Sequence, residues 1–139
     1  MTLFIPMPTK SSKKYTYALG RRKAAVATVK LFAGKSASTV NKLEVSKYFP
    51  TTFIFLEKPF IKTETQNKYY YEAKIVGGGK EGQREALTLA LSRALKIINP
   101  DFTSPLRQAG LLTVDSRVRQ RRMVGTGGKA RRQKQSPKR

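Results

Sequence analysis

The sequence predicts a single domain of mixed α and β structure, with basic extensions at both ends. Apolar side chains alternate at period two near the amino terminus, which is typical of strands, and recur at helical spacing between about Glu81 and Asn99. The chain has 139 residues, and a domain of about 100 residues buries roughly 60–65% of its unfolded surface. One core is therefore expected.

Two strands are predicted first, over 15–19 and 24–32, with residues 20–23 as the turn between them. The core face of the second strand is predicted to consist of Ala25, Ala27, Val29 and Leu31. A turn at 34–36 and a third short strand at 38–43 follow. These elements form the β part of the predicted domain.

The middle of the chain is predicted to begin with a short helix over 45–49. Residues 51–60 form a solid apolar run that fits either a buried strand or a helix that stops near Pro59, and the helix is the interpretation adopted. Residues 69–76 are aromatic and β-branched and indicate another strand.

A long amphipathic helix is predicted from about residue 81 to 99. Its apolar stripe consists of Leu87, Ala90, Leu91, Ala94, Leu95 and Ile98. A second short helix is expected over 101–110, with Gly110 just beyond its last turn. Periodicity is lost after Thr113, which indicates an extended tail.

Positive charge is concentrated in the two flanks. The chain has 29 Lys and Arg against 8 Asp and Glu, a net charge of +21. Residues 1–42 contain nine bases and no acid, residues 44–115 contain ten bases and all eight acids, and ten further bases follow Asp115. A nearly neutral body with two cationic flanks indicates a polyanionic partner.

Nucleic acid fits the carboxyl-terminal flank better than a membrane does. Seven of its ten bases are Arg, whose planar fork matches phosphate. Its large apolar side chains are too few for an interfacial helix, and no stretch of the chain approaches the ~20 apolar residues of a membrane span. No membrane partner is expected.

Catalysis lacks its usual groups, because the chain contains no Cys and no His. Thiol nucleophiles, zinc sites of Cys/His type and imidazole acid–base chemistry are therefore excluded. Glu81 and Glu85 could form an acid–base pair, but Lys80 and Arg84 beside them favour surface ion pairs. The sequence predicts no enzyme and no cofactor.

A triple-glycine loop, 77–79, lies between a predicted strand and a predicted helix, where backbone N–H groups can hold a phosphate. A nucleotide-binding Walker loop would need Gly at Lys74 and Ser or Thr at Glu81, so that interpretation is excluded. A contact to a nucleic-acid phosphate and a purely structural tight turn both stay open.

Other candidates for nucleic-acid contact are weaker. The basic triplet at 21–23 could equally be a solvated turn. Several tyrosines could stack on bases or pack at a core edge, namely Tyr15, Tyr17, Tyr69, Tyr70 and Tyr71.

A series of short motifs runs in order from Tyr15 to Arg139. They are Gly20-Arg21-Arg22-Lys23-Ala24-Ala25, Val40-Asn41, Tyr48-Phe49, Val76-Gly77-Gly78-Gly79, Gln83, Ser92-Arg93-Ala94-Leu95, Leu106-Arg107-Gln108-Ala109-Gly110-Leu111-Leu112-Thr113, Asp115, Arg117, Arg121, Ala130-Arg131-Arg132 and Lys138-Arg139. In order and spacing they resemble small-subunit ribosomal protein family nine. The resemblance covers roughly nine-tenths of the chain.

The resemblance implies an α+β fold, a mixed sheet backed by helices like the second domain of the fifth small-subunit ribosomal protein, with an extended basic tail. It divides the chain into a flexible extension (1–14), a globular rRNA-binding domain (15–113) and the tail (114–139). It also implies a structural role in translation. The implied partners are small-subunit rRNA in the 3′ major (head) domain, peptidyl-site tRNA and neighbouring small-subunit proteins.

The resemblance further implies individual contacts. The candidate rRNA-binding residues are Arg21, Arg22, Lys23, Gly77, Gly78, Gly79, Lys80, Gln83, Arg84, Arg93, Arg117, Arg119, Arg121, Arg122, Lys129, Arg131 and Arg132. The candidate tRNA-binding residues are Lys138 and Arg139. The chain departs from the family at Val114 and Thr28, where the family has Arg, and at Ser136-Pro137, where the usual ending has an aromatic residue.

Two rival functions and two compartments follow from the same residues. The rivals are a nucleic-acid-modifying enzyme, which lacks a catalytic group, and a free RNA-binding or chaperone protein. The expected location is the ribosome. Abundant Lys, Thr, Tyr and Phe favour a plastid member made inside the organelle, because no transit peptide is evident. The bacterial cytoplasm is the alternative.

Overall fold

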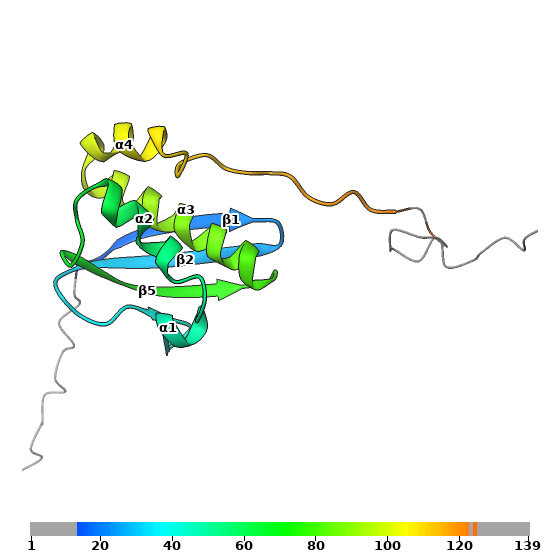
Figure 1. Ribbon diagram of the computed structural model, residues 1–139, viewed down its shortest axis with the longest axis horizontal. Coiled ribbons are helices and arrows are strands. Elements are labelled where there is room, and N and C mark those ends of the chain that lie inside the picture. Colours follow the sequence, from blue (N-terminus) through cyan, green and yellow to red (C-terminus); the bar gives the residue numbers. More distant parts are fainter. Residues whose placement is uncertain (1–13, 123, 125–139) are drawn as a thin grey trace, which may run out of the picture.

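The computed structural model describes residues 14–122 and residue 124. The strands are β1 (Thr16–Arg22), β2 (Ala25–Ala33), β3 (Thr39–Val40), β4 (Leu43–Glu44) and β5 (Tyr69–Val76). The helices are α1 (Val45–Tyr48), α2 (Ile54–Lys62), α3 (Lys80–Ile98), the 3₁₀ turn η1 (Pro100–Phe102) and α4 (Thr103–Gln108). After α4 the chain leads away from the body without regular structure (Figure 1).

The sheet is mixed and has the strand order β1-β2-β5-β3-β4. β1 and β5 each pair antiparallel with β2, β3 pairs parallel with β5, and β4 pairs antiparallel with β3. With α3 packed across β1 and β2, this is the α+β fold with a mixed sheet backed by helices that the sequence analysis expected. That expectation is confirmed.

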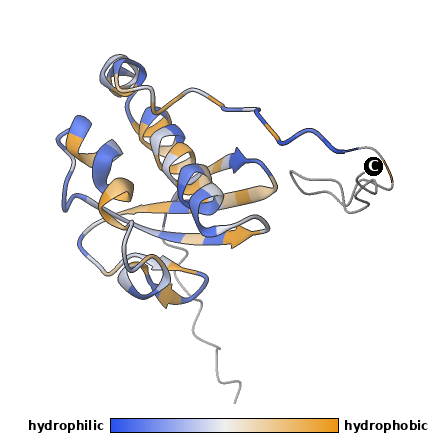
Figure 2. Cartoon of the chain, turned by 45° about the vertical axis from the view of Figure 1, so that its right-hand side comes forward, coloured by the Kyte–Doolittle hydropathy of each residue, from blue (hydrophilic) through white to orange (hydrophobic). Residues whose placement is uncertain are grey.

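The core lies between the sheet and α3. All four predicted core residues of β2 are buried, as is the stripe of α3 except Ile98, which is half-buried. In Figure 2 apolar residues mark the strands and α3, whereas hydrophilic residues dominate the segment after α4. The described residues include no helix long and apolar enough to cross a membrane.

The predicted turn at 20–23 is wrong, because β1 continues through Arg22. The tip is shorter and consists of Lys23, with φ of +52°, and Ala24. Gly20 is buried within the strand, where its missing Cβ lets β1 lie against the backbone of α3. Gly20 is therefore needed for the close approach of β1 to α3 and not for a turn.

The predicted single strand at 38–43 is also wrong. Asn41 and Lys42 have φ of +49° and +68° and divide this stretch into β3 and β4. Two consecutive residues with positive φ are typical of a two-residue hairpin turn. Asn adopts a positive φ more readily than most residues, so Asn41 is compatible with this turn, whereas the Lys at position 42 does not predict it.

The predicted stop of α2 near Pro59 is wrong, because the helix runs to Lys62 with Pro59 inside it. Proline removes one hydrogen bond within a helix. Here Leu56, Pro59 and Phe60 are buried together, and this packing outweighs the lost bond. The helix ends where the Thr63 hydroxyl lies 2.9 Å from the Pro59 carbonyl oxygen.

The remaining helices agree with the prediction. α1 and α3 occupy the expected stretches, and η1 and α4 together span 100–108, within and just before the helix expected over 101–110. Gly110 has φ of +69°, and its N–H donates to the Arg107 carbonyl while that of Leu111 donates to Leu106. These two bonds are the Schellman end of a helix. The proposed division of the chain into extension, body and tail stays a prediction.

Candidate nucleic-acid interface

The tip of the β1–β2 hairpin, the glycine loop and the start of α3 meet at one end of the sheet. Val26, next to the tip, pairs with Val76 at the end of β5. Gly77 and Gly78 have φ of +74° and +68°, and a Cβ on Gly78 would lie 2.8 Å from Cβ of Ala25. The loop therefore requires glycine for its conformation and its packing on the hairpin. This end of the sheet is called the loop end below.

A hydrogen-bond chain holds the glycine loop. Gln83 donates from Nε2 to the Gly77 carbonyl oxygen at 3.0 Å, and the Tyr48 hydroxyl donates to Gln83 Oε1 at 2.9 Å. Gln83, a predicted RNA contact, thus has a structural partner on each side of its amide. It connects the loop to α1.

Asn41 joins the small β3–β4 hairpin to β5. Its Oδ1 accepts from the Ile75 N–H at 2.9 Å, and its Nδ2 donates to the Ile75 carbonyl oxygen at 3.1 Å. The Asn41 side chain thereby forms the two backbone hydrogen bonds of Ile75 that a neighbouring strand would otherwise form. Asn41 and Tyr48 were not among the predicted site residues, although their motifs, Val40-Asn41 and Tyr48-Phe49, mark both positions.

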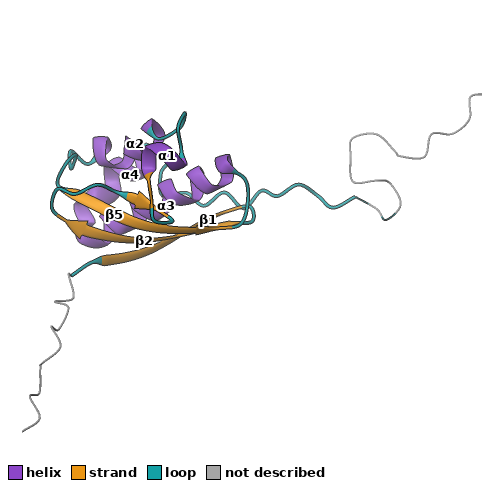
Figure 3. Ribbon diagram, turned by 90° about the horizontal axis from the view of Figure 1, so that it is seen from below, coloured by secondary structure: helices purple, strands orange, loops and turns teal. Residues whose placement is uncertain are grey.

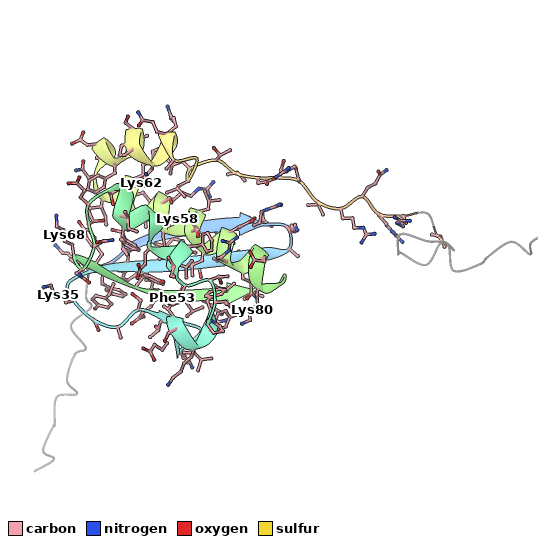
Figure 4. The ribbon with its side chains drawn as sticks, viewed as in Figure 1. Lys35, Phe53, Lys58, Lys62, Lys68 and Lys80 are labelled. Atoms are coloured by element: carbon pink, nitrogen blue, oxygen red, sulfur yellow. The ribbon has the colours of Figure 1, made fainter. Side chains whose placement is uncertain are left out.

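Lys80 brings a cation to the start of α3, where the positive end of the helix dipole already lies. Its Nζ donates to the Tyr48 carbonyl oxygen at 3.2 Å and lies 3.5 Å from the centre of the Tyr48 ring. The carbonyl and the aromatic face offset the repulsion from the helix end. Figure 4 shows Lys80 at the loop end, remote from Lys62 on α2.

The basic triplet is divided between the two faces of the sheet, because successive strand residues point to opposite sides. Arg22 points to the α3 side and is only 11% exposed. Its Nε donates to Glu85 Oε2 at 2.6 Å, and one terminal nitrogen donates to the Arg117 carbonyl oxygen at 2.6 Å. Its other terminal nitrogen lies 3.3 Å from Oδ2 of Asp115.

Arg22 therefore ties the hairpin, α3 and the base of the tail together. Arg21 and Lys23 differ from it. Both side chains are exposed and make no hydrogen bond or ion pair within the part of the chain that the structure describes. They are the cations of the triplet that are available to a phosphate.

Arg84 and Arg93 are likewise bound within the chain. A terminal nitrogen of Arg84 lies 2.7 Å from Oε2 of Glu81, and the guanidinium lies 4.5 Å from the centre of the Phe55 ring. Arg93 donates to the Leu19 carbonyl oxygen at 2.7 Å. The expected ion pairs of Glu81 and Glu85 are confirmed. RNA contact by Arg84 and Arg93 stays a prediction.

The tail begins at an ion pair between Asp115 and Arg117. Hydrogen bonds from the Arg117 side chain, then from its backbone N–H, hold the pKa of Asp115 well below its usual range. The same pair raises the pKa of Arg117, whose side chain is 85% exposed. Arg119 and Arg121 are exposed farther along, as is Arg122.

Five predicted contacts lie outside the described residues: Lys129, Arg131, Arg132, Lys138 and Arg139. The structure brings together Arg21, Lys23, the glycine loop and Lys80 at one end of the sheet. Within the described ranges no cluster of His, Cys, Asp or Glu could hold a metal ion. The arrangement is a positively charged edge around a backbone loop, which suits phosphate groups.

Comparison with known proteins points the same way. Residues 20–139 match the family model described as ribosomal protein S9/S16. The small ribosomal subunit protein uS9 of Porphyromonas gingivalis is 42% identical over 127 residues, which cover 90% of this chain and 98% of that protein. The uS9 proteins of Phocaeicola vulgatus and Malacoplasma penetrans are 44% and 39% identical, over 88% and 87% of this chain and 96% and 94% of theirs.

Proposed function

Because this chain belongs to the ribosomal protein S9 family and is a non-enzymatic structural component of the small ribosomal subunit, we propose that its loop end binds rRNA of the subunit head. Arg21, Lys23 and Lys80 neutralise phosphates there, and the glycine loop offers backbone N–H groups. The observation that carries the proposal is the convergence of these groups at one exposed end of the sheet.

Arg22 and Arg84 have a different part in this proposal. Their guanidinium groups are paired with Glu85, Asp115 and Glu81. They hold the hairpin and the start of α3 in place, and Arg22 also positions the base of the tail, while the exposed cations contact the RNA. Among the proposed contacts, Lys80 is already held by Tyr48, so it loses less side-chain entropy on binding than a free cation.

Exchanging Arg21 and Lys23 together for Gln is expected to reduce the salt dependence of rRNA binding. Each phosphate contact contributes about 0.7–0.9 to the slope of log affinity against log salt, so the slope becomes less steep by about 1.5. The measurement is filter binding of the full chain to a transcript of the 3′ major domain at several salt concentrations.

The matched control replaces Lys62 and Lys96 by Gln, since both are exposed away from the loop end. Lys62 lies on α2, remote from Lys80 (Figure 4), and Lys96 lies in the last turn of α3. It changes the net charge equally and leaves the loop end intact. Equal slopes for the two variants would show that the hairpin tip contributes only general charge and would overturn the proposed interface.

We further propose that Lys138 and Arg139 at the end of the tail contact tRNA in the peptidyl site. The support is the resemblance of the terminal motif and the length of the tail. Residues 116–139, fully extended at about 3.3 Å each, could reach up to ~80 Å from the body. An Arg fork binds phosphate in two contacts.

Deleting residues 136–139 is expected to leave incorporation into small subunits unchanged and to weaken tRNA binding in the peptidyl site. Purified subunits that carry the shortened chain are titrated with tRNA by filter binding. The control exchanges Arg131 and Arg132 for Gln, which removes as much positive charge from the middle of the tail. Unchanged tRNA affinity in the deletion variant would refute the tRNA contact.

The compartment is proposed on composition. Abundant Lys, Thr, Tyr and Phe support a plastid member, whereas the relatives described above are bacterial. Sequencing the DNA that surrounds the gene distinguishes a plastid genome from a bacterial chromosome.

A further inference from the structure

The face of the sheet opposite the helices is uncovered in the part of the chain that the structure describes. In Figure 3 the helices lie on one side of the sheet, and β1 and β2 form the other side. Antiparallel sheets commonly expose one face to water, and that face is then polar. Here it also carries exposed aromatic side chains, and we call it the open face.

An aromatic row crosses three strands on the open face. The Phe32 ring of β2 is stacked on Tyr70 of β5 at 5.1 Å between centres and packs against Tyr15, just before β1, at 5.7 Å. Phe32 is 8% exposed, whereas Tyr15 and its neighbour on this face, Tyr17, are 50% and 53% exposed. Phe32 thus packs between Tyr15 and Tyr70, and Tyr15 and Tyr17 stay accessible on the same face.

Cations accompany these rings. Lys30 pairs in register with Tyr17, and its Nζ lies 5.1 Å from the centre of the Tyr15 ring. Lys74 is exposed on the next strand of the same face. Glu72 also lies on the open face and forms no ion pair with a described residue. The open face therefore combines aromatic rings with excess positive charge.

We infer that the open face binds unpaired nucleotides of rRNA, with bases stacked on Tyr15 and Tyr17 and phosphates at Lys30 and Lys74. This inference rests on the proposed function, which makes rRNA the partner, and adds the open face of the sheet to the contacts proposed at its loop end. Aromatic side chains on a sheet stack readily on bases that are not paired. A duplex hides its base faces, so the surface selects single-stranded segments.

Charge favours RNA over a protein on this face. A protein partner would have to match two lysines and two tyrosines with acidic groups placed between apolar ones. A single RNA strand presents phosphates and flat bases in alternation along its length and so meets both kinds of side chain. Stacking on an aromatic residue is worth about 1–3 kcal/mol per base.

The first test measures binding of the full chain to a 12-nucleotide oligo(A) and to a blunt RNA duplex across a range of salt. Replacing Tyr15 and Tyr17 by Ala is expected to weaken oligo(A) binding about tenfold or more, with an unchanged salt slope. Duplex binding stays the same. Phe at both positions keeps the affinity, because the ring rather than the hydroxyl is required.

Variants of the lysines separate the two components. Lys30→Gln with Lys74→Gln is expected to reduce the salt slope by more than the control with Gln at Lys62 and Lys96. The matched control for the tyrosines replaces exposed Ile97 by Ala and changes nothing. Circular dichroism of each variant confirms the fold. Wild-type oligo(A) affinity in the folded Tyr15→Ala, Tyr17→Ala variant would overturn the inference.

The second test uses assembled small subunits. The chain has no cysteine, so Lys74→Cys supplies a single attachment point for a photoreactive benzophenone on the open face. Cross-links to rRNA are expected. Cross-links to protein alone would overturn the inference without touching the proposed function, which fails on a different result, the unchanged salt slope of the hairpin variant.

Discussion

Replacing Gly20 by Ala destabilises the protein by about 3 kcal/mol, because overpacked interiors have costs of this order. A Cβ at this position would collide with the Ala86 carbonyl oxygen and lie 2.7 Å from the Ala90 backbone nitrogen. Both atoms belong to the backbone of α3, which cannot rotate out of the way. Thermal denaturation followed by circular dichroism should show a Tm lower by about 12–20 °C.

The control is Gly79→Ala. Gly79 has φ of −93°, and beyond its chain neighbours no heavy atom lies within 4 Å of the place that a Cβ would occupy. We expect a change of no more than about 0.5 kcal/mol, as is usual for surface substitutions. Equal destabilisation by both substitutions would mean that the contact between β1 and α3 is looser than described.

Replacing Asn41 by Ala is expected to destabilise the protein by about 2–3 kcal/mol. The Ile75 N–H and carbonyl oxygen both lose their side-chain partner, and an unsatisfied half-buried group costs about 1–3 kcal/mol. Alanine is also strained at φ of +49°. Urea denaturation measures the loss, and hydrogen exchange of the Ile75 amide should accelerate.

Asn41→Gly separates these two causes. Glycine removes the side chain but accepts the positive φ, so the difference between the two variants measures the backbone strain, expected at about 1 kcal/mol. Identical stabilities of the Gly and Ala variants would show that strain at this turn is negligible. Wild-type exchange of the Ile75 amide in either variant would contradict the role of the Asn41 side chain.

The regular elements were predictable because their patterns are long. β2 has nine residues and α3 has nineteen, so the apolar pattern repeats several times in each element. The role of Gly110 was predictable too, since it lies just after a short helix and no apolar periodicity follows it. Such features depend on neighbours in the sequence.

The errors concern positions decided by distant residues. Gly20 looks like a turn residue until Ala86 and Ala90 of α3 are placed against it. Pro59 looks like a helix stop until its burial with the core is known. The strand at 38–43 breaks because of two positive φ angles, of which only the one at Asn41 has a residue that suggests it. Tertiary packing overrides local preference at each of these places.

The sequence predicts which basic residues belong to the candidate site, but it does not predict how their side chains are arranged. The sequence identifies the basic residues near the hairpin, but strand alternation sends Arg21 and Arg22 to opposite faces once β1 extends through them. Which cation is exposed then depends on Glu85 and Asp115, residues far along the chain. No local pattern carries that information.

The junction at Arg22 also bears on the order in which the chain folds. It connects residues 63 and 95 positions apart, and contacts of such long sequence separation form slowly because a large loop must close. During synthesis Arg22 emerges first, Glu85 later and Arg117 last. The hairpin can dock on α3 before the junction closes, so the direction in which residues 117–122 leave the body is set only at the end of folding.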